Sequence, residues 1–308
     1  MNSRLIVVNA DDFGRSSDVN AAVVRAHREG LVSSASLMVT GDAFEEAVAL
    51  ARQNPRLAVG LHLVLSDGRA ALPAARISHL VDESGQFLVD PVVAGWHYFL
   101  RPHVRTELAD EVAAQFERFA ATGLPLSHVD GHQHLHAHPS VFRTVLSLAE
   151  EHRAVGVRIP HDDLSLSLRF SRKHAARNLS WSAVWTGLSA WCRVQLHGRR
   201  LISPRRTYGF FQTGEVTSAY LQYLAPRIQG PVELYLHPTL GARVDPLGPN
   251  FEDFAAVSDP AAIEAFSQAG LEPATYAQLA RPEQRSTRLS ISNSKSSRET
   301  AAQTLRRV

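Results

Sequence analysis

Two adjacent carboxylates, Asp11 and Asp12, come just after the apolar run at 5–8, in the segment VNADDFG. The apolar run is typical of a buried strand, so both side chains are expected just beyond the end of that strand. Neighbouring carboxylates repel one another unless a cation or hydrogen-bond donors stabilise them. This pair is therefore a candidate for one side of a metal site.

A histidine-rich segment, HVDGHQHLHAHP, supplies further candidate ligands around Asp130. Its histidines are His128, His132, His134, His136 and His138. By itself the segment is equally consistent with a metal-binding tract that has no catalytic role, or with histidines on a surface loop. Its combination with the aspartate pair and with GLH at His62 is more specific, because all three lie at ends of predicted strands. Aspartate and neutral imidazole bind divalent ions, and three protein ligands leave a position for water, as catalytic sites require.

Strand-like and helix-like runs alternate along the chain. The strand-like runs are at 4–10, 35–40, 57–63, 124–130, 155–159 and 231–237. Helical patterns are at 17–29, 43–53, 104–121, 139–152, 216–225 and 260–269. This alternation predicts a parallel sheet covered by helices, either an open doubly wound sheet or a (β/α) barrel.

The positions of the polar residues favour the barrel. Aspartate or histidine lies at the end of the first, third, fourth and last predicted strands. In a barrel these ends open onto one face, whereas an open sheet gathers residues only near its switch point. We therefore expect an irregular, TIM-like (β/α) barrel of the α/β class, formed by a single domain at 1–280, with a long loop at 64–103. The polar segment 281–308 is expected to be a disordered tail.

The motifs NADDFG, GLHL and HVDGHQHLH, in this order and at these separations, resemble those of the YdjC-like carbohydrate deacetylases, which include chitooligosaccharide deacetylases. The resemblance covers residues 4 to about 280. It implies an irregular, deacetylase-type (β/α) barrel and metal-dependent hydrolysis of the N-acetyl group of an amino sugar. Matched position by position, it implies that Asp12, His62 and His132 bind one divalent ion, that Asp11 is the general base, and that His237, in LHP, is the general acid.

Amide chemistry is consistent with these roles. Hydrolysis needs an activated water, a polarised carbonyl group and a proton for the departing amine. A bound dication can lower the pKa of its water from about 15.7 to about 7 and polarise the acetyl oxygen. Asp11 and His237 would divide the base and acid roles, each contributing about 10² to 10⁴-fold. The ligand set suits Zn²⁺ and, with extra waters, Mg²⁺ or manganese.

Five further residues are expected to support the ligands or to contact substrate. Asp130 would orient a histidine ring through its free nitrogen, since ligating imidazoles usually donate to a carboxylate or carbonyl group. His128 lies two positions before Asp130 in the sequence. It is likewise expected to support the ligands or to contact substrate. His134 and His136 either contact substrate or simply line the loop. Arg158 either meets a sugar hydroxyl, fixes an active-site carboxylate or is a structural ion-pair partner.

The segment 164–206 is expected to be a helical insertion. It contains nine Arg and Lys residues, no Asp or Glu, and three of the four tryptophans. Its apolar side chains at helical spacing form a stripe, consisting of Trp181, Val184, Trp185 and Leu188. The stripe could pack on the barrel beneath a solvated basic face, hold the protein at an anionic membrane, or cover a lipid part of the substrate. No nucleic-acid partner is expected, because a metal-site barrel offers no supporting groove.

Further short motifs, among them VAGWHYF, YGFFQTG, ELYLHP and LGPN, resemble the branch of the family associated with hopanoid biosynthesis. This resemblance implies an N-acetylglucosaminyl hopanoid lipid as the substrate. One alternative is a chitooligosaccharide deacetylase that acts on soluble sugar. Another is a non-catalytic glycolipid- or metal-binding protein on the same barrel, disfavoured because Asp11, His237 and all three expected ligands are present.

The composition is typical of a soluble globular protein. The chain has 308 residues, 44% of them hydrophobic and 20% charged, with a formal net charge of +2. Its one cysteine, Cys192, excludes an intramolecular disulfide framework and suits a reducing compartment. No signal peptide or membrane-spanning run of roughly 18 apolar residues is recognisable. We therefore expect a cytoplasmic location, with peripheral contact through 164–206 at the inner face of an anionic membrane.

Overall fold

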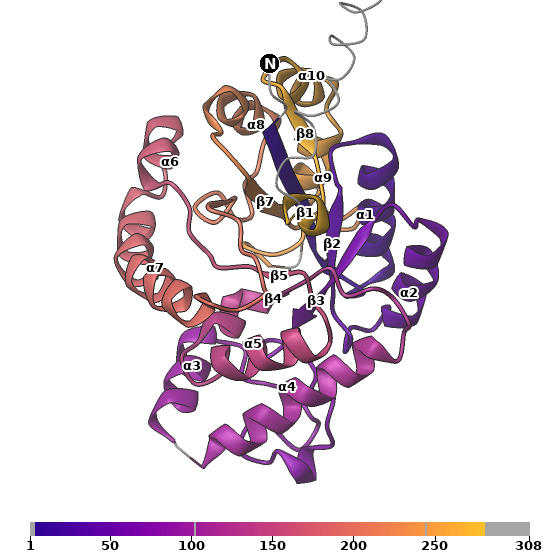
Figure 1. The fold of residues 1–308 in the computed structure, drawn as a ribbon, viewed down its shortest axis with the longest axis vertical. Coiled ribbons are helices and arrows are strands. Elements are labelled where there is room, and N and C mark those ends of the chain that lie inside the picture. The colour runs from indigo at the N-terminus through magenta and orange to yellow at the C-terminus, as the bar shows by residue number, and fades with distance from the viewer. Residues whose placement is uncertain (1–3, 102, 244, 281–308) are drawn as a thin grey trace, which may run out of the picture.

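A curled parallel sheet forms the centre of the protein in a computed structural model, which describes residues 4–101, 103–243 and 245–280 (Figure 1). The described residues form eight strands: β1 (Arg4–Phe13), β2 (Ser34–Leu37), β3 (Ala58–Leu63), β4 (His128–Gly131), β5 (Gly156–Val157), β6 (Thr207–Tyr208), β7 (Val232–Leu236) and β8 (Leu271–Pro273). The strand order is β5-β4-β3-β2-β1-β7-β6, with β8 also paired to β1, and all these pairs are parallel.

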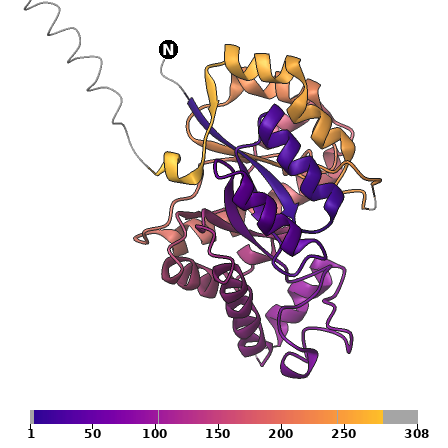
Figure 2. The same cartoon turned by 90° about the vertical axis from the view of Figure 1, so that its right-hand side faces the viewer.

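Helices follow the strands and surround the sheet (Figures 1 and 2). The α-helices are α1 (Ser17–Glu29), α2 (Phe44–Gln53), α3 (Pro91–Leu100), α4 (Val104–Ala120), α5 (Phe142–Glu151), α6 (Leu164–Phe170), α7 (Ala175–Leu196), α8 (Ser218–Leu224), α9 (Phe251–Ser258), α10 (Pro260–Gln268) and α11 (Tyr276–Leu279). Short 3₁₀ turns lie at Ala74–Arg76, His132–Ala137 and Ala225–Arg227. No helix in the described ranges is both long and apolar enough to cross a membrane.

The predicted α/β barrel is confirmed as a curled parallel sheet. Among the described residues, no ladder joins β5 directly to β6. The chain at 202–208 lies across this gap, because Ile202 forms a parallel bridge to Gly156 of β5 and the Thr207 N–H donates to the carbonyl of His161. The irregularity of the barrel is therefore concentrated at its two shortest strands.

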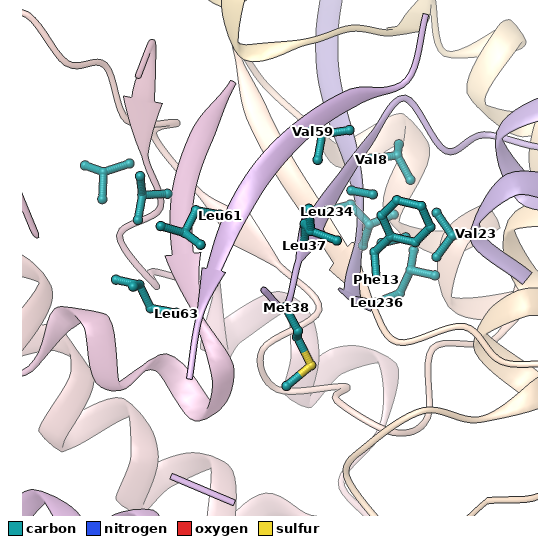
Figure 3. Packing of buried hydrophobic residues seen from close by; sticks show 14 of the residues in the cluster. Val8, Phe13, Val23, Leu37, Met38, Val59, Leu61, Leu63, Leu234 and Leu236 are labelled. Carbon is teal, nitrogen blue, oxygen red and sulfur yellow. The ribbon is translucent and has the colours of Figure 1, made fainter. Parts of the chain in front are cut away.

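The first strand and helix show how the sequence specifies a buried strand and the helix that covers it. β1 is buried from Ile6 to the end of the strand, as expected for a parallel strand covered on both faces. The side chain of Ser16 caps α1 by accepting from the Val19 N–H, and the helix ends before Gly30. Figure 3 shows Phe13 of β1 grouped with Val23 of α1 and with core side chains of neighbouring strands.

The structure differs from the sequence prediction at 64–103 and agrees with it at 164–206. The segment 64–103 is not a continuous loop, because it contains α3, whose first turn is capped by Asp90 through the N–H groups of Val92 and Val93. The helix was missed because its apolar residues lie on both faces and leave no amphipathic pattern. The insertion at 164–206 is helical, as predicted, and contains α6 and α7. The predicted tail at 281–308 lies outside the described residues.

Candidate active site

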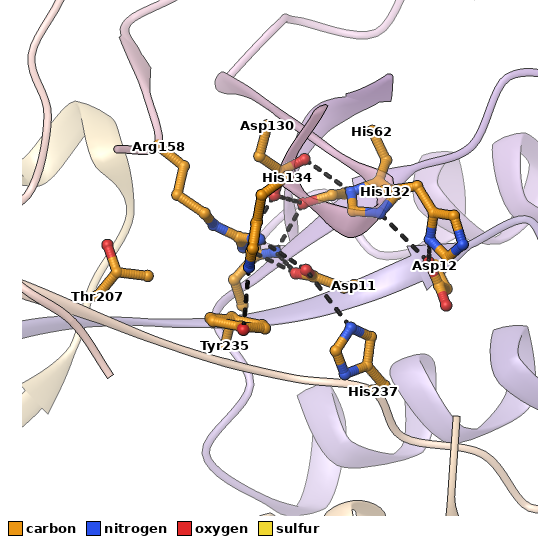
Figure 4. Close-up of polar contacts among 12 residues, drawn as sticks. Asp11, Asp12, His62, Asp130, His132, His134, Arg158, Thr207, Tyr235 and His237 are labelled. Atoms are coloured by element: carbon orange, nitrogen blue, oxygen red, sulfur yellow. Dashed lines mark hydrogen bonds and ion pairs between the residues drawn. The ribbon is translucent and has the colours of Figure 1, made fainter. Parts of the chain in front are cut away.

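The C-terminal ends of four strands bring the predicted site residues together (Figure 4). Asp11 and Asp12 lie at the end of β1, His62 in β3, and His132 directly after β4. His237 follows β7, the neighbour of β1 on its other side. Residues separated by more than 200 positions in the sequence therefore share one buried cluster, because all these strands are parallel.

Asp12, His62 and His132 form one compact group. Asp12 Oδ1 lies 3.2 Å from His62 Nε2 and 3.1 Å from His132 Nδ1. Asp12 has a positive φ of 63°, and the pairing of β1 with β2 shifts register between Ala10 and Phe13. Aspartate tolerates this left-handed conformation better than most residues, and a bulge re-aims the side chain at a strand end.

The three residues fit a divalent ion. Their ligand atoms lie within 4.8 Å of one another and all three side chains are buried. Ligands about 2.0 to 2.2 Å from a tetrahedral ion are about 3.3 to 3.6 Å apart, slightly more than the observed separations of 3.2 and 3.1 Å. The Nε2 atom of His62, which faces Asp12, is buried without a hydrogen-bond partner among the described residues. Such an unpaired nitrogen is costly unless a ligand occupies the site.

Asp130 fixes the orientation of the His62 ring. Its Oδ1 lies 2.8 Å from His62 Nδ1, so the other ring nitrogen faces Asp12. Ligating histidines commonly have such a carboxylate behind them. Burial alone would lower the pKa of His62, but Asp130 and Asp12 raise it to about 10. Burial would likewise raise the pKa of Asp12, but His132 and His62 lower it well below its ordinary value.

Arg158 holds Asp11 and two other carboxylates in the interior. Its Nη1 and Nη2 donate to Asp11 Oδ2 and Oδ1 at 2.6 and 2.7 Å. The same guanidinium lies 2.8 Å from Asp130 and 2.9 Å from Glu233. Burial would lower the pKa of Arg158, but Asp11, Asp130 and Glu233 raise it well above its ordinary value. Of the roles left open for Arg158, the geometry matches the fixing of a carboxylate.

His237 lies beside Asp11 without a direct hydrogen bond. Its Nε2 is 3.9 Å from Asp11 Oδ2, and its Nδ1 has no hydrogen-bond partner among the described residues. Asp253 holds the backbone of His237 by accepting its N–H at 2.9 Å. Burial lowers the pKa of His237, and the carboxylates of Asp12 and Asp11 oppose this shift only in part. The His237 side chain is 12% exposed, and burial favours its neutral form over the protonated one.

Three of the remaining histidines of the histidine-rich segment separate into two groups. His134 lines the cavity described below, and its Nε2 lies 3.1 Å from the hydroxyl of Tyr235. His136 is buried beside the backbone, with its Nε2 2.9 Å from the carbonyl oxygen of Arg158. His128 stacks on Tyr276 with ring centroids 4.5 Å apart. Neither His128 nor His136 is among the residues that line the cavity.

A cavity of about 410 Å³ opens above these residues. Asp11, His62, His132 and His237 line its polar part. Its apolar wall contains the whole predicted stripe of α7, together with aromatic and aliphatic side chains from three other segments: Trp181, Val184, Trp185, Leu188, Phe210, Leu247 and Val92. The stripe therefore faces the cavity, and its Trp185 and Leu188 also pack against the hydrophobic core.

Sequence reasoning missed several residues of the site. Asp67 Oδ2 lies 3.6 Å from His132 Nε2, and Arg15 bonds to Asp12 Oδ2 at 3.1 Å. Glu233 accepts from both Arg158 and Tyr276. The run VELYL contained the signal for Glu233, because a carboxylate within a buried apolar strand needs a partner. Asp67 and Arg15 lie in loops and had no comparable signal.

Comparisons with known proteins show similarity to one family over most of the chain. The YdjC-like protein family matches residues 5–280. A chitooligosaccharide deacetylase of Yersinia enterocolitica is 30% identical over 288 residues, covering 89% of this chain and 98% of that protein. A carbohydrate deacetylase of Brevibacillus brevis is 46% identical over 155 residues, which cover 50% of this chain. The chain spans 59% and 58% of the length of the first two curated relatives that it matches.

The fold also resembles a solved structure. A protein of Enterococcus faecalis V583, named as a candidate cellobiose-phosphate cleavage protein, superimposes with a TM-score of 0.68 at 21% identity. The similarity covers 91% of this chain and 100% of that one. At this identity the likeness concerns the fold alone. With the family match over nearly all described residues, the chain belongs to the YdjC-like protein family.

Proposed function

We propose that this protein is a metal-dependent carbohydrate deacetylase that hydrolyses the N-acetyl group of an amino sugar. The observation that carries the proposal is the position of Asp11 and His237 beside the Asp12–His62–His132 group, on the polar side of one cavity. Family membership and relatives named carbohydrate or chitooligosaccharide deacetylase support the same reaction. The reaction consumes water and releases acetate and a free amine.

The residues divide the work of amide hydrolysis. A divalent ion held by Asp12, His62 and His132 would supply a water of lowered pKa and polarise the acetyl oxygen. Asp11, held by two hydrogen bonds from Arg158, accepts a proton from the attacking water. His237, in its protonated form, donates a proton to the nitrogen as the C–N bond breaks and becomes neutral. The ion is Mg²⁺ or Zn²⁺ in this proposal, since the donor set suits both.

Substitution of the carboxylates tests the reaction and the metal separately. Asp11→Asn should retain bound metal and lose at least 10²-fold in acetate release, because it removes the base. Asp12→Asn and His132→Ala should lose both metal and activity. The exposed Asp42→Asn is a matched control that should leave both unchanged. Near wild-type turnover of Asp11→Asn, measured beside metal content by plasma mass spectrometry, would show that Asp11 is not the base.

The substrate in this proposal is an N-acetylglucosaminyl hopanoid lipid, so the sugar is lipid-linked. The apolar cavity wall formed by α7, Phe210 and Leu247 supports an amphiphilic substrate. The motifs shared with the hopanoid-associated branch support the same choice. A protein acting on such a lipid would be cytoplasmic and peripheral at the inner membrane face, and the sequence alone predicts 164–206 as its contact.

A soluble chitooligosaccharide is the alternative substrate, favoured by the relative that is matched over nearly its whole length. Mass spectrometry after incubation with the glycolipid and, separately, with chitobiose distinguishes the two. Loss of one acetyl group from the lipid alone supports the hopanoid proposal. Loss from chitobiose alone supports the soluble sugar. No loss from either substrate, with metal bound, would favour a non-catalytic glycolipid- or metal-binding protein.

A further inference from the structure

Helix α3 exposes an apolar face to solvent. Val92, Trp96 and Phe99 recur at helical spacing and are 65%, 59% and 50% exposed. Val93 and Leu100 lie on the same face and are 53% and 66% exposed. We call these five side chains the α3 surface. A soluble helix normally turns such residues inward, so a contiguous exposed set indicates an interaction site.

The opposite face of α3 anchors the helix to the protein. Ala94, Gly95 and Tyr98 are buried, and the Tyr98 hydroxyl donates to the carbonyl of Leu65 at 2.6 Å. Asp90 caps the first turn. The exposed apolar face is therefore held in place by packing on the other side and does not result from a loosely attached segment. Leu88 and Val89, just before the cap, are also exposed and extend the apolar character of the region.

The α3 surface is continuous with the candidate active-site cavity. Val92 belongs to both, because it lines the cavity together with Pro91. Trp181 and Val184 of α7 line the same cavity, and Val184 is 67% exposed. Apolar surface therefore runs from the cavity wall onto the outside of the molecule along α3. An amphiphile whose sugar reaches the metal ligands could keep its apolar part in contact with this surface.

The charges beside α3 suit an anionic partner. The two carboxylates that flank this region have other partners, because Asp90 caps α3 and Glu107 bonds to the N–H and ring of His79. Arg101 and Arg105 follow the helix and are exposed. An interfacial helix typically combines aromatic side chains that enter the headgroup region with basic residues that meet anionic headgroups. The ring centroids of Trp96 and Phe99 lie 6.4 Å apart, in an edge-to-face arrangement. These two aromatic side chains are the ones best suited to the headgroup region.

From this arrangement we propose that the α3 surface docks the protein on an anionic lipid bilayer, with Trp96 and Phe99 in the interface and the cavity opening towards the lipid. The inference deepens the lipid-linked part of the proposed function. Docking itself requires no hydrolysis, so the two can fail independently. The contact differs from the one expected at 164–206, where the most exposed apolar side chains of α7 are Leu179, Val184 and Val194.

Vesicle co-sedimentation tests the proposal. The full chain should bind vesicles of phosphatidylcholine with phosphatidylglycerol at least tenfold more tightly than vesicles of phosphatidylcholine alone. The double variant Trp96→Ser/Phe99→Ser should lose at least tenfold in binding, and Arg101→Gln/Arg105→Gln should lose the preference for phosphatidylglycerol. Both should retain the wild-type circular dichroism spectrum, because all four side chains are exposed. Leu179→Ser/Val194→Ser is the matched control on α7 and should bind like the wild type.

Other outcomes would overturn the docking surface. If the α7 control loses binding while Trp96→Ser/Phe99→Ser keeps it, the contact is made by α7. If the wild type binds neither vesicle but is a dimer by light scattering that Trp96→Ser/Phe99→Ser converts to monomer, the α3 surface is an interface between copies of this chain. Asp12→Asn separates docking from catalysis, because it should bind vesicles normally and release no acetate. Vesicle binding with no hydrolysis by the wild type would contradict the proposed function but not the docking surface.

Discussion

Arg158 and Asp11 form a fully buried, two-point pair, with Nη1–Oδ2 and Nη2–Oδ1 distances of 2.6 and 2.7 Å. A guanidinium fork fixes both position and rotation of a carboxylate, which a lysine cannot do. The same guanidinium also faces Asp130, which orients His62. Arg158 therefore contacts both the candidate base, Asp11, and the carboxylate that orients a candidate metal ligand, His62.

Replacing Arg158 by lysine should reduce kcat much more than it changes KM. Lysine keeps the positive charge among the three carboxylates but loses the fork, so Asp11 would no longer be held at one angle. We expect kcat to fall about 10²-fold with metal content near wild type. Arg158→Gln should also lower the free energy of unfolding by about 3–5 kcal/mol in urea denaturation, because it leaves buried charge uncompensated. Equal changes in kcat and KM would argue against a positioning role.

Asp130→Asn should weaken metal binding without removing a ligand. The amide keeps the shape of the carboxylate but no longer stabilises the His62 ring as a charged acceptor, and such changes typically cost about 10 to 100-fold in metal affinity. Calorimetric titration with Zn²⁺ or Mg²⁺ measures the effect. Asp110→Asn, on a half-exposed residue of α4, is the control. Unchanged metal affinity in Asp130→Asn would mean that a carboxylate hydrogen-bonded to His62 Nδ1 is not required for metal binding.

Removing the metal should abolish acetate release and lower the melting temperature. An ion that binds only the folded state at 100 times its Kd stabilises that state by about 2.7 kcal/mol, which corresponds to several degrees. Dialysis against a chelator followed by thermal unfolding tests this, and adding Zn²⁺ or Mg²⁺ should restore both properties. The melting temperature of Asp12→Asn should not respond to the chelator. If the wild type shows no response either, these residues do not hold a stabilising ion.

Asp253 should make the protein less stable as the pH rises. Burial raises its pKa to about 7 from an ordinary value of 3.8, although the N–H groups of His237 and Val216 bond to the carboxylate. A carboxyl whose folded pKa is raised stabilises the fold below its unfolded pKa, and this contribution, on the order of a few kcal/mol, is lost as the pH rises through 7.

Urea unfolding at pH 5 and pH 8 measures this dependence. Between these values the wild type should lose more free energy of unfolding than Asp253→Asn, whose amide does not titrate. The absolute stability of the variant is not the readout, because the two N–H groups bond to different carboxylate oxygens and the amide replaces one of these oxygens with an NH₂ group, which cannot accept. Parallel losses in the two proteins would assign the pH dependence to other groups.

Local patterns in the sequence were sufficient to predict many of the strands and helices. The helical pattern at 17–29 predicted α1 with its observed bounds, and the apolar run before Asp11 predicted a buried strand. Parallel strands all end at one edge, so the convergence of Asp12, His62 and His132 followed from the strand assignments alone. The helical spacing of the α7 stripe also showed which side chains share a face.

The tertiary structure determined what each helix face and each buried side chain contacts. The sequence could not tell that the α7 stripe lines a cavity, nor that Arg158 pairs with Asp11, because both depend on contacts between segments distant in the chain. α3 was missed because its outward face is apolar, which removes the alternation from which a surface helix is recognised. Sequence periodicity records which side chains lie together on an element, whereas partners, burial and cavity shape arise only when the elements pack.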